Sequence, residues 1–185
     1  GQYQNTFVLD DFEDGEVTWE AAENTTKVEV TDQVRIAPDA AAFGERCLSF
    51  RFNSTSFENG GYAEKGILKK FAEPLDIGEY TTFNLAVDVP AGLPAGGTHT
   101  LTVIFYGERI NTATMTLQEE QWNYFSVDLS KFAGDKKVEQ IKIWYNSGCA
   151  EAFNKFIYVD GIGFSGEKGN AEPGDDTAPQ AGCGA

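Results

Sequence analysis

Hydrophobic and polar residues alternate with a period of two in short runs, which Gly, Pro, Asn and Asp separate. Successive side chains of a β-strand point to opposite faces, so this period predicts strands rather than helices. Ten strands are expected, at residues 7–12, 27–36, 46–53, 66–71, 81–89, 98–107, 112–118, 122–129, 138–146 and 156–164. Such a series predicts an all-β fold, a two-sheet antiparallel β-sandwich or jelly roll.

In three of these strands the alternation also separates an inner face from an outer one. The apolar positions predicted to face the core are Phe83, Leu85, Val87, Leu101, Val103, Phe105, Ile141, Ile143 and Tyr145. The residues predicted to share the opposite, mixed face include Asp88, Tyr106, Gln140, Lys142, Trp144 and Asn146.

This mixed face has the chemistry of a sugar-binding surface. A pyranose ring has apolar C–H faces that stack on aromatic rings, and hydroxyls that need donors and acceptors. Trp144 and Tyr106 are the expected stacking residues, and Tyr62 is placed to reach in from a loop. The expected hydrogen-bonding residues are Asp88, Lys142, Asn146 and Gln140. The alternative is that Trp144 is covered by a loop and is structural.

Composition divides the chain into two parts. Residues 1–165 carry the strand pattern and are predicted to form one β-sandwich module. Residues 166–185 are small, polar and rich in Gly and Pro, and lack the apolar side chains that offset ordering entropy. This segment is predicted to be a tail or a linker to another module.

The charge of the chain restricts its partners. With 29 acidic and 14 basic residues the formal net charge is −15, so neither nucleic acid nor an anionic membrane surface is an expected partner. No apolar run is long enough to span a bilayer. We expect a secreted or cell-surface protein, since a mature secreted chain has lost its signal peptide.

Few residues are suited to catalysis. The single histidine, His99, lies at a strand start and is expected at the surface of a strand edge. Nucleophile elbows, phosphate-binding loops and zinc motifs are absent from the sequence. We therefore expect a non-catalytic module. The alternatives are a jelly-roll polysaccharide lyase or glycosidase, with two acids or a Tyr–Lys pair, and a protein-binding adhesion module with an exposed apolar patch.

The three cysteines do not follow a metal-ligand spacing. Cys47 lies within an apolar strand pattern and is predicted to be a free, buried thiol. Cys149 and Cys183 lie in loop-like sequence and form a possible disulfide, because at most one internal disulfide is available to three cysteines.

The segment FVLDDFEDG, residues 7–15, gathers four carboxylates around Phe12. Val8 and Phe12 are expected on the core side, which places Asp11 and Glu13 opposite. Asp160 lies among apolar residues of the predicted last strand, where an uncompensated charge is costly. If the first and last strands are neighbours, these acids and a backbone carbonyl near Gly44 or Glu45 form a structural Ca²⁺ site. The alternative is that Asp160 caps a turn through its own backbone.

Six motifs follow one another within residues 7–164, namely LDDFEDG, GERCLSFRFN, LDIGEYTTFNLAVDV, QWNYFSVDLSKF, VEQIKIWYNS and FIYVDGIGF. Their order resembles that of carbohydrate-binding modules with a galactose-binding-like jelly roll, particularly family 11 and the related families 4 and 22.

The resemblance implies a concave aromatic-bearing face, a structural calcium ion near the first and last strands, and no catalytic activity. It also implies a β-glucan-like ligand from a plant or microbial polysaccharide, and a glycoside hydrolase domain in cis. By position, the family's sugar-contacting tyrosine corresponds to Tyr145, whereas the alternation favours Trp144, and both stay open here.

Overall fold

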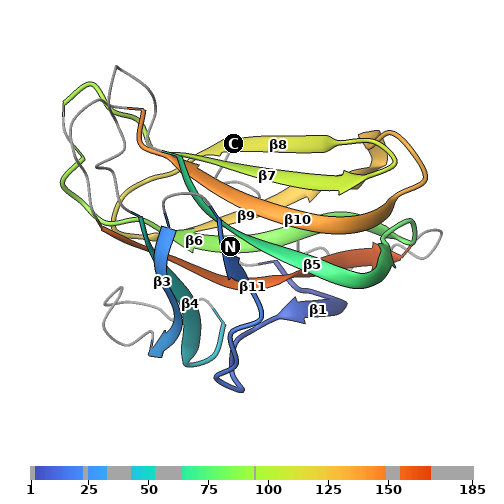
Figure 1. The fold of residues 1–185 in the computed structure, drawn as a ribbon, viewed down its shortest axis with the longest axis horizontal. Helices are drawn as coiled ribbons and strands as arrows, with labels where there is room; N and C mark the ends of the chain where they lie inside the picture. The colour runs from blue at the N-terminus through green and yellow to red at the C-terminus, as the bar shows by residue number, and fades with distance from the viewer. Residues whose placement is uncertain are drawn as a thin grey trace.

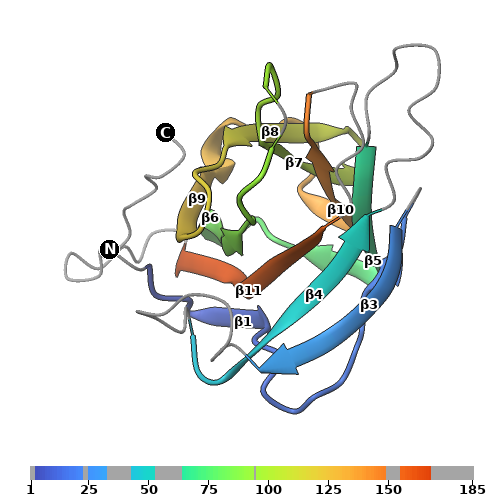
Figure 2. The ribbon, with the colours of Figure 1, turned by 90° about the vertical axis from the view of Figure 1, so that its left-hand side faces the viewer.

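The computed structural model describes residues 3–22, 25–32, 43–52, 64–93, 95–148 and 155–167. These residues form eleven strands and one short 3₁₀ turn. The strands make two antiparallel sheets that pack face to face, as Figures 1 and 2 show from two directions. The predicted two-sheet β-sandwich is therefore confirmed.

The six-stranded sheet has the order β3-β4-β11-β6-β9, and β1 pairs with β11 beside this path. Its strands are β1 (Phe7–Asp10), β3 (Thr25–Asp32), β4 (Arg46–Phe52), β6 (Tyr80–Asp88), β9 (Trp122–Asp128) and β11 (Phe156–Glu167).

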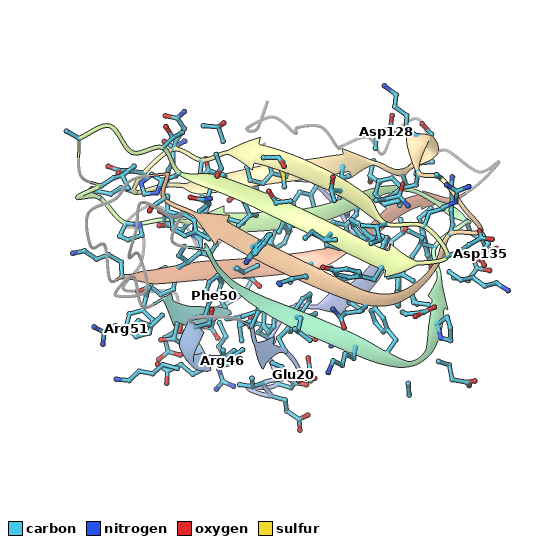
Figure 3. The ribbon with its side chains drawn as sticks, turned by 45° about the horizontal axis from the view of Figure 1, so that its top comes forward. Glu20, Arg46, Phe50, Arg51, Asp128 and Asp135 are labelled. Atoms are coloured by element: carbon cyan, nitrogen blue, oxygen red, sulfur yellow. The ribbon has the colours of Figure 1, made fainter. Side chains whose placement is uncertain are left out.

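The five-stranded sheet has the order β2-β5-β10-β7-β8. Its strands are β2 (Glu20–Ala21), β5 (Glu64–Asp76), β7 (Thr100–Gly107), β8 (Asn111–Thr116) and β10 (Lys137–Asn146). The 3₁₀ turn η4 (Leu129–Lys131) follows β9, and Asp128 lies at its start (Figure 3). The Asp128 carboxylate caps the start of this turn, because it accepts the backbone N–H of Ser130.

The core lies between the sheets and consists of the alternate residues of the central strands. All nine side chains expected to face inward are at most 1 % exposed, namely Phe83, Leu85, Val87, Leu101, Val103, Phe105, Ile141, Ile143 and Tyr145. The alternation in β6, β7 and β10 thus predicted the inner face correctly, because each strand has one face against the opposite sheet.

The first strand differs from the prediction. Val8 is 50 % exposed, whereas its neighbours Phe7 and Leu9 pack against the core. The ladder between β1 and β11 shifts register between Val8 and Asp10, and the chain turns at Phe12 with a φ of 62°. A shift of one residue exchanges the two faces of a strand, so Phe12 is buried although Val8 is not.

β2 was not expected, because two residues are too few to produce a period. β11 extends to Glu167, and residues 168–185 lie outside the described residues. The predicted boundary between module and tail therefore stays a prediction.

Candidate functional site

The outer face of the five-stranded sheet carries the residues expected to contact a sugar, in rows that cross the strands. In one row Trp144 of β10 pairs with Gly66 of β5 and Thr102 of β7. In the next row Lys142 pairs with Leu68 and Ile104, and beyond it Gln140 pairs with Lys70 and Tyr106. Figure 1 shows β5, β10, β7 and β8 side by side in this layer.

Trp144 is the central aromatic residue of this face. The Nζ atom of Lys142 lies 4.4 Å from the centre of its ring, within the range of a cation–π contact. Lys142 is only 8 % exposed, so its ammonium group is held close to the sheet. The indole Nε1 of Trp144 is buried, and within the described part of the chain it has no hydrogen-bond partner.

Gly66 sets how closely Trp144 approaches the neighbouring strand. A Cβ atom on Gly66 would lie 2.4 Å from the carbonyl oxygen of Ile143 and 3.0 Å from Cδ1 of the indole. Any larger residue would displace the ring or the strand. Because Gly66 has no side chain, the indole of Trp144 can pack directly against the backbone of β5.

Threonine hydroxyls continue the row of Trp144 toward the edge of the sheet. The hydroxyl of Thr102, next to the indole, lies 3.0 Å from that of Thr114 on β8, and the two form an exposed hydrogen bond. Each hydroxyl is both a donor and an acceptor. An aromatic ring is thus followed by groups that can bind sugar hydroxyls.

Tyr106 lies on the same face and is half-buried. It pairs with Gln140, four residues along β10 from Trp144, which corresponds to about 13 Å at the usual rise of a strand. One ring cannot contact both aromatic residues. A saccharide that contacted both Trp144 and Tyr106 would therefore need several sugar rings.

Asn146 lies at the far end of this face, and its carboxamide oxygen accepts the N–H of Gly148. This bond fixes the side chain at the end of the strand. Tyr62, which was also expected here, lies outside the described residues.

The structure does not place Asp88 on this face. β6 belongs to the six-stranded sheet, where Asp88 pairs with Trp122 and Tyr158 and is 3 % exposed. The expectation that it lies beside Trp144 is wrong, because alternation assigns the faces of one strand and does not show which strands share a sheet.

Tyr145 faces the core and is fully buried. Its hydroxyl lies 2.5 Å from Nδ1 of His99, and the other ring nitrogen of His99 lies 2.6 Å from the Glu119 carboxylate. Of the two positions left open by the sequence, Trp144 and not Tyr145 points to the outer face.

His99 is 4 % exposed, so its expected place at the surface of a strand edge is wrong. The residue precedes β7, and its imidazole packs between Tyr145 and Glu119 instead of facing solvent. Nothing in the local sequence indicated that His99 is buried, because its partners Tyr145 and Glu119 lie 46 and 20 residues away along the chain.

The carboxylates of the opening segment have hydrogen-bond partners within the protein. Glu13 accepts the backbone N–H groups of Glu45 and Arg46, at 3.0 and 2.9 Å. Asp11 accepts the N–H of Glu13, and Asp10 accepts both the indole N–H of Trp19 and the Lys69 ammonium at 2.8 Å. These bonds fasten the loop after β1 to β4 and β5.

Asp160 is fully buried in β11, and its carboxylate accepts the N–H of Gly161 at 2.7 Å. This bond to the neighbouring backbone is the kind of contact that the turn-capping alternative predicted for Asp160. Among the described residues, no group of three or more His, Cys, Asp and Glu side chains is arranged to hold a metal ion. The calcium site of Asp11, Glu13, Glu45 and Asp160 therefore stays a prediction.

A second group of aromatic residues covers the outer face of the six-stranded sheet, and the sequence did not reveal it. Buried Cys47, Ala86 and Trp122 pack there with Phe43, Tyr124 and Tyr158. Cys47 is a free thiol, as expected, and its burial raises its pKa, helped by the nearby Asp160 and Asp88. Tyr3 extends the cluster by ring contacts with Phe43 and Tyr124.

Solved structures with this architecture include carbohydrate-binding modules. One structure, from work on the promiscuous specificity of β-sandwich carbohydrate-binding modules, matches with a TM-score of 0.63 and 18% identity over 89% of this chain and 62% of that chain. The family 11 module of a cellulosomal cellulase of Clostridium thermocellum matches with a TM-score of 0.55 and 12% identity, over 90% of this chain and 96% of that one. Modules of families 28 and 22 also match.

An exo-β-agarase structure matches with a TM-score of 0.63 and 11% identity, over 92% of this chain but 26% of its own. This chain therefore spans 62% of the length of the first structure named above and about a quarter of the length of the agarase. No family model matches the sequence, and a search of curated proteins found no match. The resemblance to the β-sandwich of carbohydrate-binding modules is thus confirmed at the level of the fold.

Proposed function

We propose that this chain is a non-catalytic carbohydrate-binding module that binds a polysaccharide on the outer face of its five-stranded sheet. The observation that carries the proposal is the arrangement of Trp144. Its indole is held between Gly66 and the Lys142 ammonium, in a row that continues with the hydroxyls of Thr102 and Thr114.

Each group of this face matches one part of a sugar chain. Trp144 stacks on the apolar face of one pyranose ring, and Tyr106 on that of a ring farther along the chain. The side chains of Lys142, Gln140 and Asn146 and the threonine hydroxyls bind sugar hydroxyls. Asp88 and Tyr145 have no part in this contact, because they lie elsewhere in the fold.

The ligand class we propose is a β-glucan-like polysaccharide of plant or microbial origin. In the solved structures, one family 11 module is in complex with a β-1,3-1,4-mixed-linked tetrasaccharide, and a family 28 module is specific for non-crystalline cellulose. These ligands belong to those proteins. They support the polysaccharide class for this chain through the shared fold alone.

The proposal extends to the context of the module. Secretion or exposure at the cell surface would bring it to polymeric substrates, and a glycoside hydrolase domain in cis would gain from being held on them. The match to part of a longer agarase supports this arrangement. The described residues include no helix long and apolar enough to cross a membrane.

We also propose a structural calcium ion between the first and last strands. Carboxylate and carbonyl oxygens are the ligands that Ca²⁺ prefers, and Asp160 is a fully buried carboxylate whose charge a cation would offset. Glu13 and Asp160 would be the main ligands, with Asp11 and backbone oxygens near Glu45 completing the shell.

Affinity gel electrophoresis tests the proposed function. The wild-type chain is run in gels that contain mixed-linked β-glucan, xyloglucan, xylan, glucomannan or soluble cellulose derivatives. We expect retardation by at least one polymer, and its loss in Trp144→Ala. The control is Val8→Ala, which shortens an exposed apolar side chain on the other sheet. No retardation by any polymer would refute the proposal, and release of reducing ends would replace it with an enzyme.

A further inference from the structure

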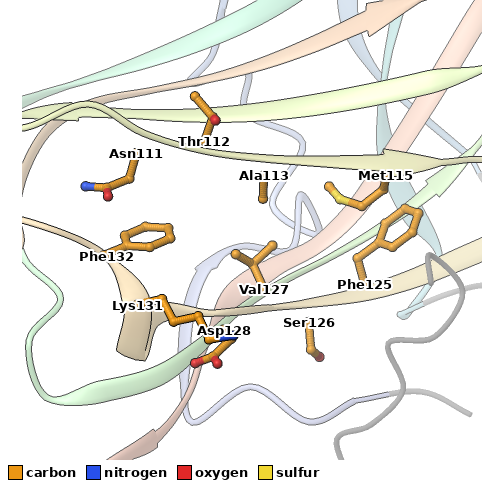
Figure 4. Close-up of a pocket in the computed structure, with 10 residues that line it drawn as sticks. All are labelled: Asn111, Thr112, Ala113, Met115, Phe125, Ser126, Val127, Asp128, Lys131 and Phe132. Carbon is orange, nitrogen blue, oxygen red and sulfur yellow. The ribbon is translucent and has the colours of Figure 1, made fainter.

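We draw no further inference here: the strongest candidate, the groove that Met115, Phe125 and Val127 line between the edge strands β8 and β9 (Figure 4), is an unpartnered apolar surface, and nothing in the described part of the structure shows what covers it.

Discussion

The ammonium nitrogen of Lys142 lies 4.4 Å from the centre of the Trp144 ring. Both residues point away from the core on the same strand, two positions apart. A cation near the ring face attracts the π electrons and restricts the rotation of both side chains. The indole is therefore ordered before any ligand arrives, which lowers the entropy cost of binding.

The first prediction follows from this contact. Lys142→Met keeps an apolar chain of similar length but removes the ammonium group. We expect the free energy of unfolding to fall by about 1 kcal/mol, within the range of about 0.5–2 kcal/mol for such contacts. Lys142→Arg is the control, because it keeps a cation over the ring. Urea denaturation followed by far-UV circular dichroism measures both, and a Met variant as stable as the wild type would contradict the prediction.

The second prediction concerns the buried histidine. His99→Ala removes the imidazole whose Nδ1 lies 2.5 Å from the Tyr145 hydroxyl in the core. We expect a loss of about 3 kcal/mol in unfolding free energy, because the substitution creates a cavity in the core and also removes a buried hydrogen bond. Tyr145→Phe in the same background removes that hydroxyl. It is expected to recover part of the loss, and a purely additive double-mutant cycle would show that the contact is unimportant.

A third prediction is a small pH dependence at the 3₁₀ turn. Two hydrogen bonds from Ser130 lower the pKa of Asp128 below its usual value. The stability from this carboxylate is therefore complete above the unfolded-state pKa of about 3.9 and is lost as the pH falls through the lower, folded value. Asp128→Asn should remove this acid-side dependence. Because Asp128 is exposed, the effect is expected near the lower end of capping energies, about 0.5 kcal/mol.

The measurement for Asp128 is the unfolding free energy of wild type and Asp128→Asn between pH 6 and about pH 3, the range that brackets a usual carboxyl pKa. The difference between the two proteins should shrink as the pH falls. A difference that stays constant over this range would show that the charge of Asp128 contributes nothing to the turn.

The fourth prediction concerns calcium. A cation bound only by the folded chain stabilises it by RT ln(1 + [L]/Kd), or about 2.7 kcal/mol at a hundredfold excess over Kd. For a domain of this size we expect Tm to fall by roughly 5–10 °C after treatment with EDTA. Asp160→Asn, which keeps the shape of the side chain but removes its charge, should abolish this response. An unchanged Tm, with no calcium found by elemental analysis, would refute the site.

The sequence predicted the strands and the inner faces well for a physical reason. In β10, Ile141, Ile143 and Tyr145 alternate with polar residues, and one face of each strand must pack against the opposite sheet. This information is local. It was enough to place Trp144 outside, together with the alternate residues Gln140, Lys142 and Asn146 of the same strand.

Pairing between distant strands is not local, and the sequence could not supply it. Asp88 has the right alternation for the sugar face, but β6 pairs with β9 and β11 in the other sheet. His99 is buried by residues that lie 20 and 46 positions along the chain. The irregular pairing after Val8 reversed the faces of β1, since the shift depends on β11.

The contact of Trp144 with a sugar is the central claim, and the indole N–H signals in a ¹H–¹⁵N correlation spectrum test it most directly. The chain has three tryptophans, and Trp144→Phe assigns the signal of this one. On titration with oligosaccharides cut from a polymer that retards the protein in a gel, we predict a saturable shift of the Trp144 signal. The Trp19 signal, whose N–H is bound to Asp10, should change little. A titration in which the Trp144 signal stays fixed while the protein binds the oligosaccharide would contradict the account.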